Sequence, residues 1–310
     1  MSFPGKGTIV KLISSFLLTL AVIIAVKSFV ADIYKINETS MDPGLIPGDR
    51  VLITKLISSP LLRRFFKPEI GDAVVFSHPE EPDLPGCLRV AGIPGDTVYV
   101  SKGVFCNTVR PELSEMIGKE HPDLRELGSF PPTRLSSKGE SVQLEDLPFI
   151  KRVIYYSMIR QETNKKRLSI DMRVYRKGKV IDDYFLEDFL LYSGELSEVP
   201  DSLAYKWSFW AKLKEHILVS TDEKDMQIRP VLRYKGEILH EYKFRNGFYY
   251  LLSDNLSRKT DSRIFGPVAS KNLKGRAGLI LWSKIPEKSI FRSLRFDRFF
   301  KGIDVKWKRE

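Results

Sequence analysis

The feature that most limits how this chain can fold is an apolar segment near its N-terminus. Residues 12–26 carry no charge and are largely apolar, and the pattern resumes after Lys27 with Phe29, Val30 and Ala31. As a helix, residues 12–30 would be about 28 Å long, which is close to the hydrocarbon thickness of a bilayer. Lys27 can extend its amine to the membrane interface. The sequence therefore predicts a membrane-spanning anchor at residues 12–31.

The charges that flank this segment predict its orientation. Lys6 and Lys11 precede the segment, and basic flanks stay on the cytoplasmic side. We therefore expect a single-pass protein of the cytoplasmic (inner) membrane, with residues 1–11 in the cytoplasm and the chain from Asp32 onward on the extracytoplasmic side. A cleaved signal peptide is the alternative. It is less favoured, because residues 29–31 make a poor small-x-small cleavage site.

Composition limits the partners that this chain can have. It has 310 residues, of which 43% are hydrophobic, and 50 Lys and Arg residues stand against 39 Asp and Glu residues. This allows one or two folded domains with a sizeable core. On a membrane protein, a basic excess favours anionic lipid head groups. Nucleic-acid binding is the competing interpretation, but it lacks a recognisable motif. We expect membrane lipids, and no nucleic acid, as partners.

The cysteines and histidines indicate neither a metal nor another cofactor. Cys87 and Cys106 could pair in an oxidising compartment, but two cysteines do not make a disulfide framework. Two small buried hydrophobic residues are an equally good interpretation. The histidines show no metal-ligand spacing; they stand at positions 78, 121, 216 and 240.

A rigid segment with a candidate nucleophile follows the apolar stretch. Residues 37–49 read Asn-Glu-Thr-Ser-Met-Asp-Pro-Gly-Leu-Ile-Pro-Gly-Asp. Pro43 and Pro47 fix φ and the glycines permit unusual backbone, so this segment is a non-helical connector. Most serines in turns only form the turn. Whether Ser40 has a chemical role therefore depends on the rest of the chain.

Most of the remaining chain reads as β-strands. Residues 50–54, 71–76 and 88–98 are rich in β-branched and apolar side chains, and a Pro-Gly-Asp turn interrupts the third run. Residues 97–106 predict a hairpin. Residues 177–184 and 235–242 each predict a hairpin centred on Lys-Gly, and 247–252 and 275–282 predict further core strands.

Four sequence boxes follow the apolar segment in a fixed order. They read Ser40-Met41-x-Pro43-x-Leu45-x-x-Gly48-Asp49, then Gly71-Asp72-Ala73-Val74-Val75-Phe76, then Leu88-Arg89-Val90-Ala91-Gly92-Ile93-Pro94-Gly95-Asp96, then Ser253-Asp254-Asn255 with Asp261-Ser262-Arg263. In this order, directly after an apolar helix, they resemble the boxes of type I signal peptidases, the membrane serine proteases that remove signal peptides. The resemblance covers roughly residues 10–107 and 247–283, under half of the chain.

The resemblance implies a mainly β fold: a signal-peptidase-like antiparallel β core, a β-rich inserted domain and one N-terminal transmembrane helix. If the insertion returns the chain to where it left, Cys106 and Gly247 should lie close together, on neighbouring strands of one sheet. The tail has the composition of an interfacial helix or of a packed C-terminal helix. The expected division is residues 32–109 and 242–285 as the catalytic core, 110–241 as the accessory insertion and 286–310 as the basic aromatic tail.

The resemblance also implies Ser-Lys chemistry. In this family a serine attacks the scissile carbonyl and a lysine, neutral because burial lowers its pKa, acts as the general base. Ser40 is then the nucleophile. The serine's own backbone N–H holds the oxyanion, usually with a hydroxyl two residues upstream. Glu38 stands at that position and cannot donate when ionised, so Thr39 is the possible substitute. The implied substrates are signal peptides of exported preproteins, cut at small-x-small sites.

The usual lysine position is occupied by Leu88, which cannot act as a base. Lys259 stands where relatives have the serine that hydrogen-bonds the catalytic lysine, so we expect that the base has moved to this loop. Lys151, which begins a Lys-Arg-Val run, and the surface lysines Lys55 and Lys102 are weaker candidates.

Four other charged residues of the boxes suggest a supporting scaffold. Their order in the family's boxes predicts ion pairs beneath the site, although Leu256 replaces an arginine that the pattern calls for. These four residues are Arg89, Asp254, Asp261 and Arg263.

Two other functions stay open. An inactive homologue that binds signal peptides or a partner membrane protein is the main alternative to an endopeptidase. A self-cleaving transcriptional repressor with a similar Ser-Lys core is disfavoured by the anchor and by the lack of a DNA-binding module.

Overall fold

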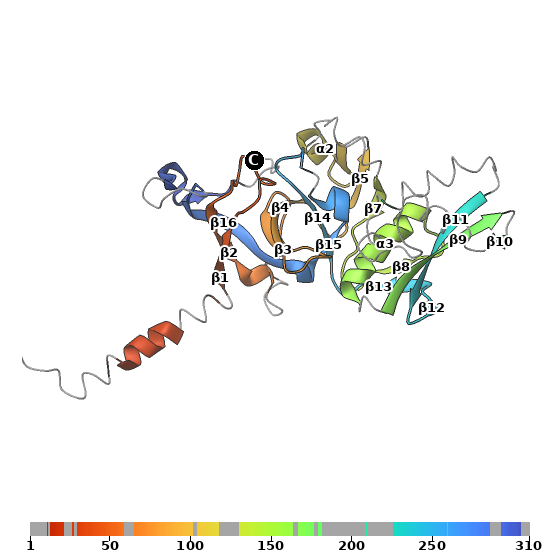
Figure 1. The fold of residues 1–310 in the computed structure, drawn as a ribbon, viewed down its shortest axis with the longest axis horizontal. Helices are drawn as coiled ribbons and strands as arrows, with labels where there is room; N and C mark the ends of the chain where they lie inside the picture. The colour runs from red at the N-terminus through yellow and green to blue at the C-terminus, as the bar shows by residue number, and fades with distance from the viewer. Residues whose placement is uncertain are drawn as a thin grey trace, which may run out of the picture.

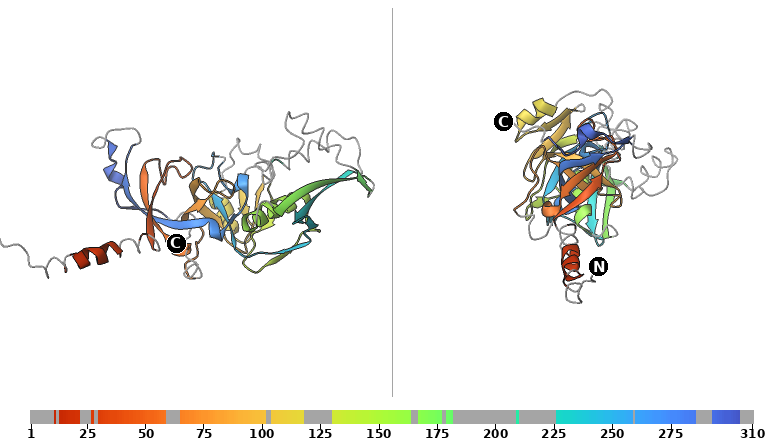
Figure 2. Two further views of the ribbon diagram at one scale, coloured as in Figure 1. Left: turned by 60° about the horizontal axis from the view of Figure 1, so that its bottom comes forward. Right: turned by 90° about the vertical axis from the view of Figure 1, so that its left-hand side faces the viewer.

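The computed structural model describes residues 11, 13–21, 27, 30–58, 65–101, 104–117, 130–163, 167–176, 179–181, 209, 226–258, 260–285 and 293–304. Figure 1 shows an elongated molecule in which the N-terminal helix extends from the end that holds β1 (Ala31–Lys35) and β2 (Asp49–Thr54). Helix α3 (Phe149–Glu162) lies toward the opposite end, as the turned view in Figure 2 also shows. The described part is mainly β, as the sequence predicts.

The largest sheet has eight strands and carries the loop with Ser40. Its order is β1-β2-β16-β3-β4-β14-β15, with β17 paired to β16, and its pairs are antiparallel. The core strands predicted from sequence are confirmed in it. Its further strands are β3 (Ala73–Ser77), β4 (Pro85–Gly92), β14 (Phe248–Leu252), β15 (Val268–Ala269), β16 (Leu273–Ser283) and β17 (Lys301–Gly302).

Hydrophobic patterning decides which strands lie deepest. β2 alternates buried and half-buried residues, as a strand with one face in the core does. β14 reads Phe-Tyr-Tyr-Leu-Leu and is buried throughout. Because successive side chains point to opposite faces, Tyr250 packs in one hydrophobic cluster while Tyr249 and Leu251 pack in another. The two faces of β14 thus join two parts of the core.

A separate three-stranded sheet follows β4. β5 (Thr97–Ser101) and β6 (Val104–Asn107) form the predicted hairpin, and β7 (Phe130–Arg134) pairs with the other edge of β5. The expectation that Cys106 and Gly247 lie on neighbouring strands of one sheet is wrong. The reason is that β14, which follows Gly247, pairs with β4 and β15, so both of its edges are occupied. β6 meets β14 through ring stacking instead: the Phe105 and Tyr250 centroids are 5.3 Å apart.

The segment between β6 and β14 is β-rich but also contains a buried helix. α3 was not predicted, because its sequence is apolar on most sides and carries no clear helical stripe; most of its residues are buried. The Lys235-Gly236 hairpin is confirmed, and both residues have the positive φ of a type I′ turn, 56° and 86°. The other elements here are α2 (Pro111–Ile117), β8 (Ser141–Gln143), β9 (Leu168–Arg176), β10 (Lys179–Ile181), β11 (Met226–Tyr234), β12 (Glu237–Ile238) and β13 (Glu241–Lys243).

A helix is expected from the sequence near each end of the chain. Of the tail expected to form a helix, residues 286–292 lie outside the described residues and residue 293 is helical. From residue 294 to 304 the chain instead forms a 3-10 turn, Phe296–Arg298, and then β17. At the N-terminus, residues 11, 13–21 and 27 are helical, while residues 12, 22–26, 28 and 29 of the expected anchor lie outside the described residues. In the described ranges no helix combines the length and apolar character needed to cross a membrane.

Candidate active site

The segment with Ser40 is a closed loop between β1 and β2. The Ile36 N–H donates to the Asp49 carbonyl at 2.9 Å, and the Gly48 N–H donates to the Ile36 carbonyl at 2.9 Å. Gly48 has a φ of 98°, a conformation that favours glycine. Met41 and Leu45 are buried in the core below the loop. Their burial fixes the residues on either side, so the position of Ser40 is set by the fold.

Ser40 is 4% exposed and contacts its neighbours through two groups. Its hydroxyl donates to Glu38 Oε2 at 3.4 Å. Its carbonyl accepts the Asn255 N–H at 3.0 Å, which joins the first sequence box to the fourth. Within the described residues the Ser40 N–H has no protein acceptor. This N–H therefore remains available to a developing oxyanion.

A buried ion pair lies directly against this loop. Arg89 on β4 donates from Nε and Nη2 to the two Asp254 carboxylate oxygens at 2.7 and 2.8 Å. The side chains are 1% and 0% exposed. Arg89 Nη1 also donates to the Gly71 carbonyl at 2.6 Å and to the Asp304 carbonyl at 2.8 Å. A Cβ added to Gly44 would lie 2.9 Å from Asp254 Oδ2, so the nucleophile loop passes too close for a larger residue.

A second buried pair shapes the loop after β14. Arg263 contacts Asp261 Oδ2 from Nη2 at 2.6 Å, and the Ser253 hydroxyl donates to the same oxygen at 2.6 Å. Burial by itself would lower the pKa of Arg263, but the charge of Asp261, its hydrogen bond to Arg263 and the nearby Tyr250 together outweigh burial and raise the pKa. Arg263 Nη2 also donates to the Leu256 and Arg258 carbonyls at 2.9 and 3.2 Å. The Leu256 position thus still contacts an arginine through its backbone.

Sequence reasoning missed a third pair, which comes from the tail. Arg298 donates from Nη2 and Nε to the two carboxylate oxygens of Asp49 at 2.6 and 3.0 Å, and from Nη2 to the Gly44 carbonyl at 2.9 Å. Asp49 is fully buried, and its Oδ2 also accepts the Ile46 N–H at 3.0 Å. Asp49 closes the first box, but nothing in the sequence indicated a partner so far along the chain.

Leu88 is packed among apolar side chains. It is 2% exposed and belongs to a cluster with Val74, Val90 and Leu251. Its neighbour Cys87 belongs instead to the cluster that contains Met41 and Leu45, because adjacent strand residues face opposite sides. Cys87, not Leu88, therefore shares the core of the nucleophile loop.

The two cysteines are free thiols, so the open question of their pairing is answered. Burial raises the pKa of Cys87 to about 12, with smaller contributions from Asp254 and Glu38. Burial likewise raises the pKa of Tyr34, whose hydroxyl donates to the Pro85 carbonyl at 2.6 Å. Both groups stay neutral at physiological pH and add an uncharged wall beside Glu38.

The candidate bases fall in different places. Lys259 and Lys102 lie outside the described residues. Lys55 Nζ is 2.8 Å from Asp32 Oδ2, so it is ion-paired. Lys151 lies on α3. Thr39 is half-buried, and its carbonyl accepts the Asp42 N–H at 3.3 Å.

No cluster of three metal-ligating side chains occurs in the portion of the chain covered by the structure.

Comparison of the sequence with known proteins matches this chain to one family. The family model described as "Signal peptidase, peptidase S26" matches residues 9–117 and 130–282. This extends beyond the resemblance seen in the sequence boxes, since it includes most of the segment between β6 and β14. Signal peptidase I of Buchnera aphidicola subsp. Baizongia pistaciae is 24% identical over 288 residues, covering 90% of this chain and 78% of that protein.

Two further relatives show how identity is distributed. Signal peptidase I of Aquifex aeolicus is 22% identical over 278 residues, 89% of this chain and 85% of that protein. Signal peptidase I of Pseudomonas aeruginosa is 36% identical, but only over 95 residues, 28% of this chain and 34% of that protein. Similarity is therefore low over the whole length and higher over a short part.

Proposed function

The chain belongs to the signal peptidase S26 family, and from this we propose that it is a membrane-bound serine endopeptidase that removes signal peptides from exported preproteins. Family membership supports a peptidase that acts on signal peptides. The observation that carries the proposal for this chain is the fixed position of Ser40. Its carbonyl is bonded to Asn255, and its loop rests on the buried Arg89–Asp254 pair.

We propose the following chemistry for Ser40. The hydroxyl oxygen attacks the scissile carbonyl while its proton passes to a general base, and the resulting oxyanion is held by the Ser40 N–H. Collapse of the tetrahedral intermediate breaks the peptide bond, and the proton passes to the leaving amine. Water then hydrolyses the acyl-enzyme and restores the serine. Thr39 is the proposed second donor to the oxyanion.

The proposed general base is Lys259, which stands two residues before Asp261 in the fourth box. The pair Asp261–Arg263 and the Ser253 hydroxyl fix the chain on both sides of this position. A lysine has a flexible four-carbon stem, and an apolar environment favours its neutral form. Leu88 is buried in an apolar cluster and has no basic group, so we propose that the base enters from another strand or loop.

We propose that the substrate is cut at a small-x-small site at the membrane surface. The predicted anchor at residues 12–31 would leave the chain single-pass in the cytoplasmic membrane, with the β domain outside and in contact with lipid. The division into a core of residues 32–109 and 242–285 with an accessory segment at 110–241 is part of this proposal.

One observation favours a second function. Leu88, which stands where the resemblance places the catalytic lysine, lies in an apolar cluster. A chain without a working base would still bind signal peptides or a partner membrane protein. This inactive homologue is the alternative to the peptidase.

Incubating the full chain with a preprotein that carries a small-x-small site tests the proposal. We expect release of a mature product with a new N-terminus at that site, and loss of at least roughly 10³-fold in rate for Ser40→Ala. Ser141→Ala is the matched control, since Ser141 is exposed on β8, outside the nucleophile loop. Absence of any product from the wild-type chain would support the inactive homologue.

A further inference from the structure

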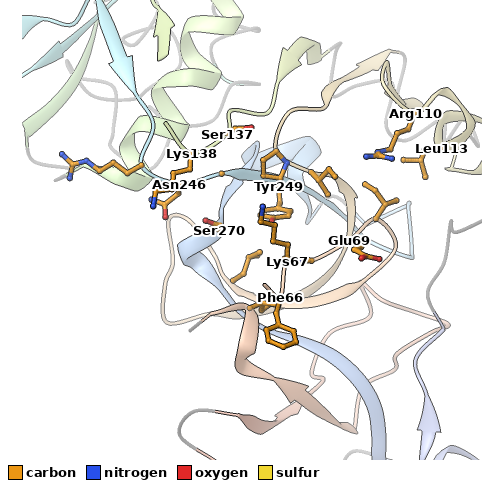
Figure 3. Close-up of a pocket in the computed structure, with 18 of the residues that line it drawn as sticks. Phe66, Lys67, Glu69, Arg110, Leu113, Ser137, Lys138, Asn246, Tyr249 and Ser270 are labelled. Carbon is orange, nitrogen blue, oxygen red and sulfur yellow. The ribbon is translucent and has the colours of Figure 1, made fainter. Parts of the chain in front are cut away.

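A large cavity lies away from Ser40. Its volume is about 1000 Å³, the upper end of the usual range for small-molecule sites, and none of Ser40, Glu38 or Asp254 lines it. Figure 3 shows Tyr249 and Lys67 near its middle, Lys138 and Asn246 on one side, and Arg110 and Glu69 on the other. The wall combines the main sheet with the loops before α2 and after β7.

The charged part of the wall is predominantly basic. Lys67, Lys138, Arg245 and Arg110 line it, against two carboxylates, Glu69 and Glu112. Arg110 is committed to Asp96, with Nε 3.4 Å from Oδ2. The other three cations are exposed. In the described part of the chain, none of these three lies within 4.0 Å of a carboxylate oxygen. Among the described residues, the cavity therefore offers three cations that form no salt bridge.

The rest of the wall combines aliphatic side chains with the hydroxyls of Tyr249, Ser137 and Ser270 and the amide of Asn246. Ile57, Ile70, Ile93 and Leu273 supply aliphatic surface. Burial raises the pKa of Tyr249 to about 12, so its phenol remains a hydrogen-bond donor at neutral pH. No hydrogen-bond partner for this phenol occurs among the described residues. Apolar surface with a few convergent polar groups is typical of a ligand site, and this one fits an amphipathic anion.

The cavity adjoins the place where the apolar N-terminal segment joins the β domain. Ala31, the first residue of β1, pairs with Thr54 at the end of β2, and the Lys55 N–H donates to the Val30 carbonyl at 2.7 Å. Ile57, on the same 3-10 turn as Lys55, lines the cavity. A cavity next to the predicted anchor lies within reach of a bilayer surface.

We propose that this cavity binds an anionic phospholipid. The phosphate contacts Lys67, Lys138 and Arg245, the Tyr249 phenol donates to a phosphate or ester oxygen, and the start of the acyl chains packs on the aliphatic wall. The choice of a lipid rests on the membrane attachment proposed above; the site itself is separate from Ser40. It would hold the domain on anionic regions of the membrane.

Titration calorimetry on the full chain tests this with dihexanoylphosphatidylglycerol below its micellar concentration. We expect saturable binding, weaker binding of dihexanoylphosphatidylcholine, and still weaker binding of inorganic phosphate. Lys67→Gln, Lys138→Gln and Arg245→Gln together should weaken phosphatidylglycerol binding roughly 10- to 100-fold. Tyr249→Phe should weaken it by a smaller factor. Ser40→Ala should bind normally, so failure of the peptidase proposal would leave this result intact.

The matched control carries the same charge change outside the cavity: Lys179→Gln, Lys235→Gln and Lys243→Gln, all exposed. This triple variant should bind like the wild type. An equal loss of phosphatidylglycerol binding in the control variant would show that binding depends only on the overall charge of the protein, and would overturn the proposed site. Phosphate binding as tightly as the lipid would overturn the lipid as occupant, and equal binding of phosphatidylcholine would overturn the role of the cations. Thermal unfolding of each variant checks that it is folded.

Discussion

The cations near Ser40 and the cations of the cavity are used in opposite ways. Arg89 and Arg298 beside the nucleophile loop are 1% and 12% exposed and each contacts both oxygens of one carboxylate. Lys67, Lys138 and Arg245 at the cavity are exposed. In the described residues they have no such partner.

The difference follows from the cost of burying charge. A buried cation without its carboxylate is strongly unfavourable, so each buried arginine fixes the position of its acid and of the backbone around it. An exposed cation stays solvated and contributes little to folding. The first arrangement therefore holds a loop in place, whereas the second leaves charge for an external anion.

Breaking the pair at the nucleophile loop should have the largest effect on stability. Asp254→Asn leaves Arg89 buried without its charge partner, and we expect the free energy of unfolding to fall by about 3–5 kcal/mol. Urea denaturation measures it. Glu140→Gln is the control, because its pair with Arg134 is 28% and 54% exposed and should be worth less than about 1 kcal/mol. Equal losses of unfolding free energy in the two variants would mean that burial does not decide how much an ion pair contributes to stability.

Releasing the tail from the nucleophile loop should have the next largest effect. Arg298→Gln removes the charge partner of Asp49 and the donor to the Gly44 carbonyl. We expect a loss of about 1–3 kcal/mol, because Asp49 keeps the Ile46 N–H. Arg295→Gln, on the same segment, should cost less, because among the described residues the Arg295 side chain bonds only to the uncharged Pro47 carbonyl and Ser283 hydroxyl. A larger loss for Arg295→Gln would place the main tail contact elsewhere.

The free energy of unfolding should depend on pH through Cys87, which lies in the core below the Ser40 loop. The pKa of Cys87 rises from its ordinary value of 9.0 to about 12 on folding. The contribution of Cys87 to the free energy of unfolding is therefore intact below pH 9, where the thiol is protonated in both the folded and the unfolded chain. It is lost as pH rises toward 12, at no more than about 1.4 kcal/mol per pH unit.

Comparing wild type with Cys87→Ala across pH 8 to 11 isolates this effect, since the tyrosines are present in both. Cys106→Ala controls for removal of a thiol. If the Cys87→Ala and wild-type curves stay parallel, Cys87 is not buried as a neutral thiol.

The cavity cations should have the smallest effect on folding. Lys67→Gln, Lys138→Gln and Arg245→Gln should each change the free energy of unfolding by less than about 0.5 kcal/mol, because exposed side chains without partners contribute little. A loss of several kcal/mol in the triple variant would show that these residues serve the fold and would remove the contrast with Arg89.

Much of the core was predictable because its signals are local. The β-branched run at residues 50–54 and the aromatic run at 247–252 indicate strands on their own, and Pro-Gly-Asp marks the turn before β5. The Lys-Gly dipeptide at 235–236 likewise indicates a turn on its own. These predictions needed no knowledge of distant contacts.

The unpredicted features depend on contacts between distant residues. Arg298 contacts Asp49 only after the tail has folded back onto the nucleophile loop. β14 pairs with β4 although a long segment of the chain separates the two strands. α3 is buried on most sides, so it lacks the helical stripe that identifies a surface helix. The packing of Leu88 in a different cluster from Met41 likewise depends on the folded sheet.

The rate of preprotein cleavage by Lys259→Ala tests the central claim, an active Ser40 with a base that has left position 88. We predict that Lys259→Ala falls to the rate of Ser40→Ala, while Lys271→Ala, an exposed lysine on the turn before β16, cleaves like the wild type. A Lys259→Ala variant that cleaves at the wild-type rate would contradict the claim and place the base elsewhere, with Glu38 as the side chain in contact with the Ser40 hydroxyl.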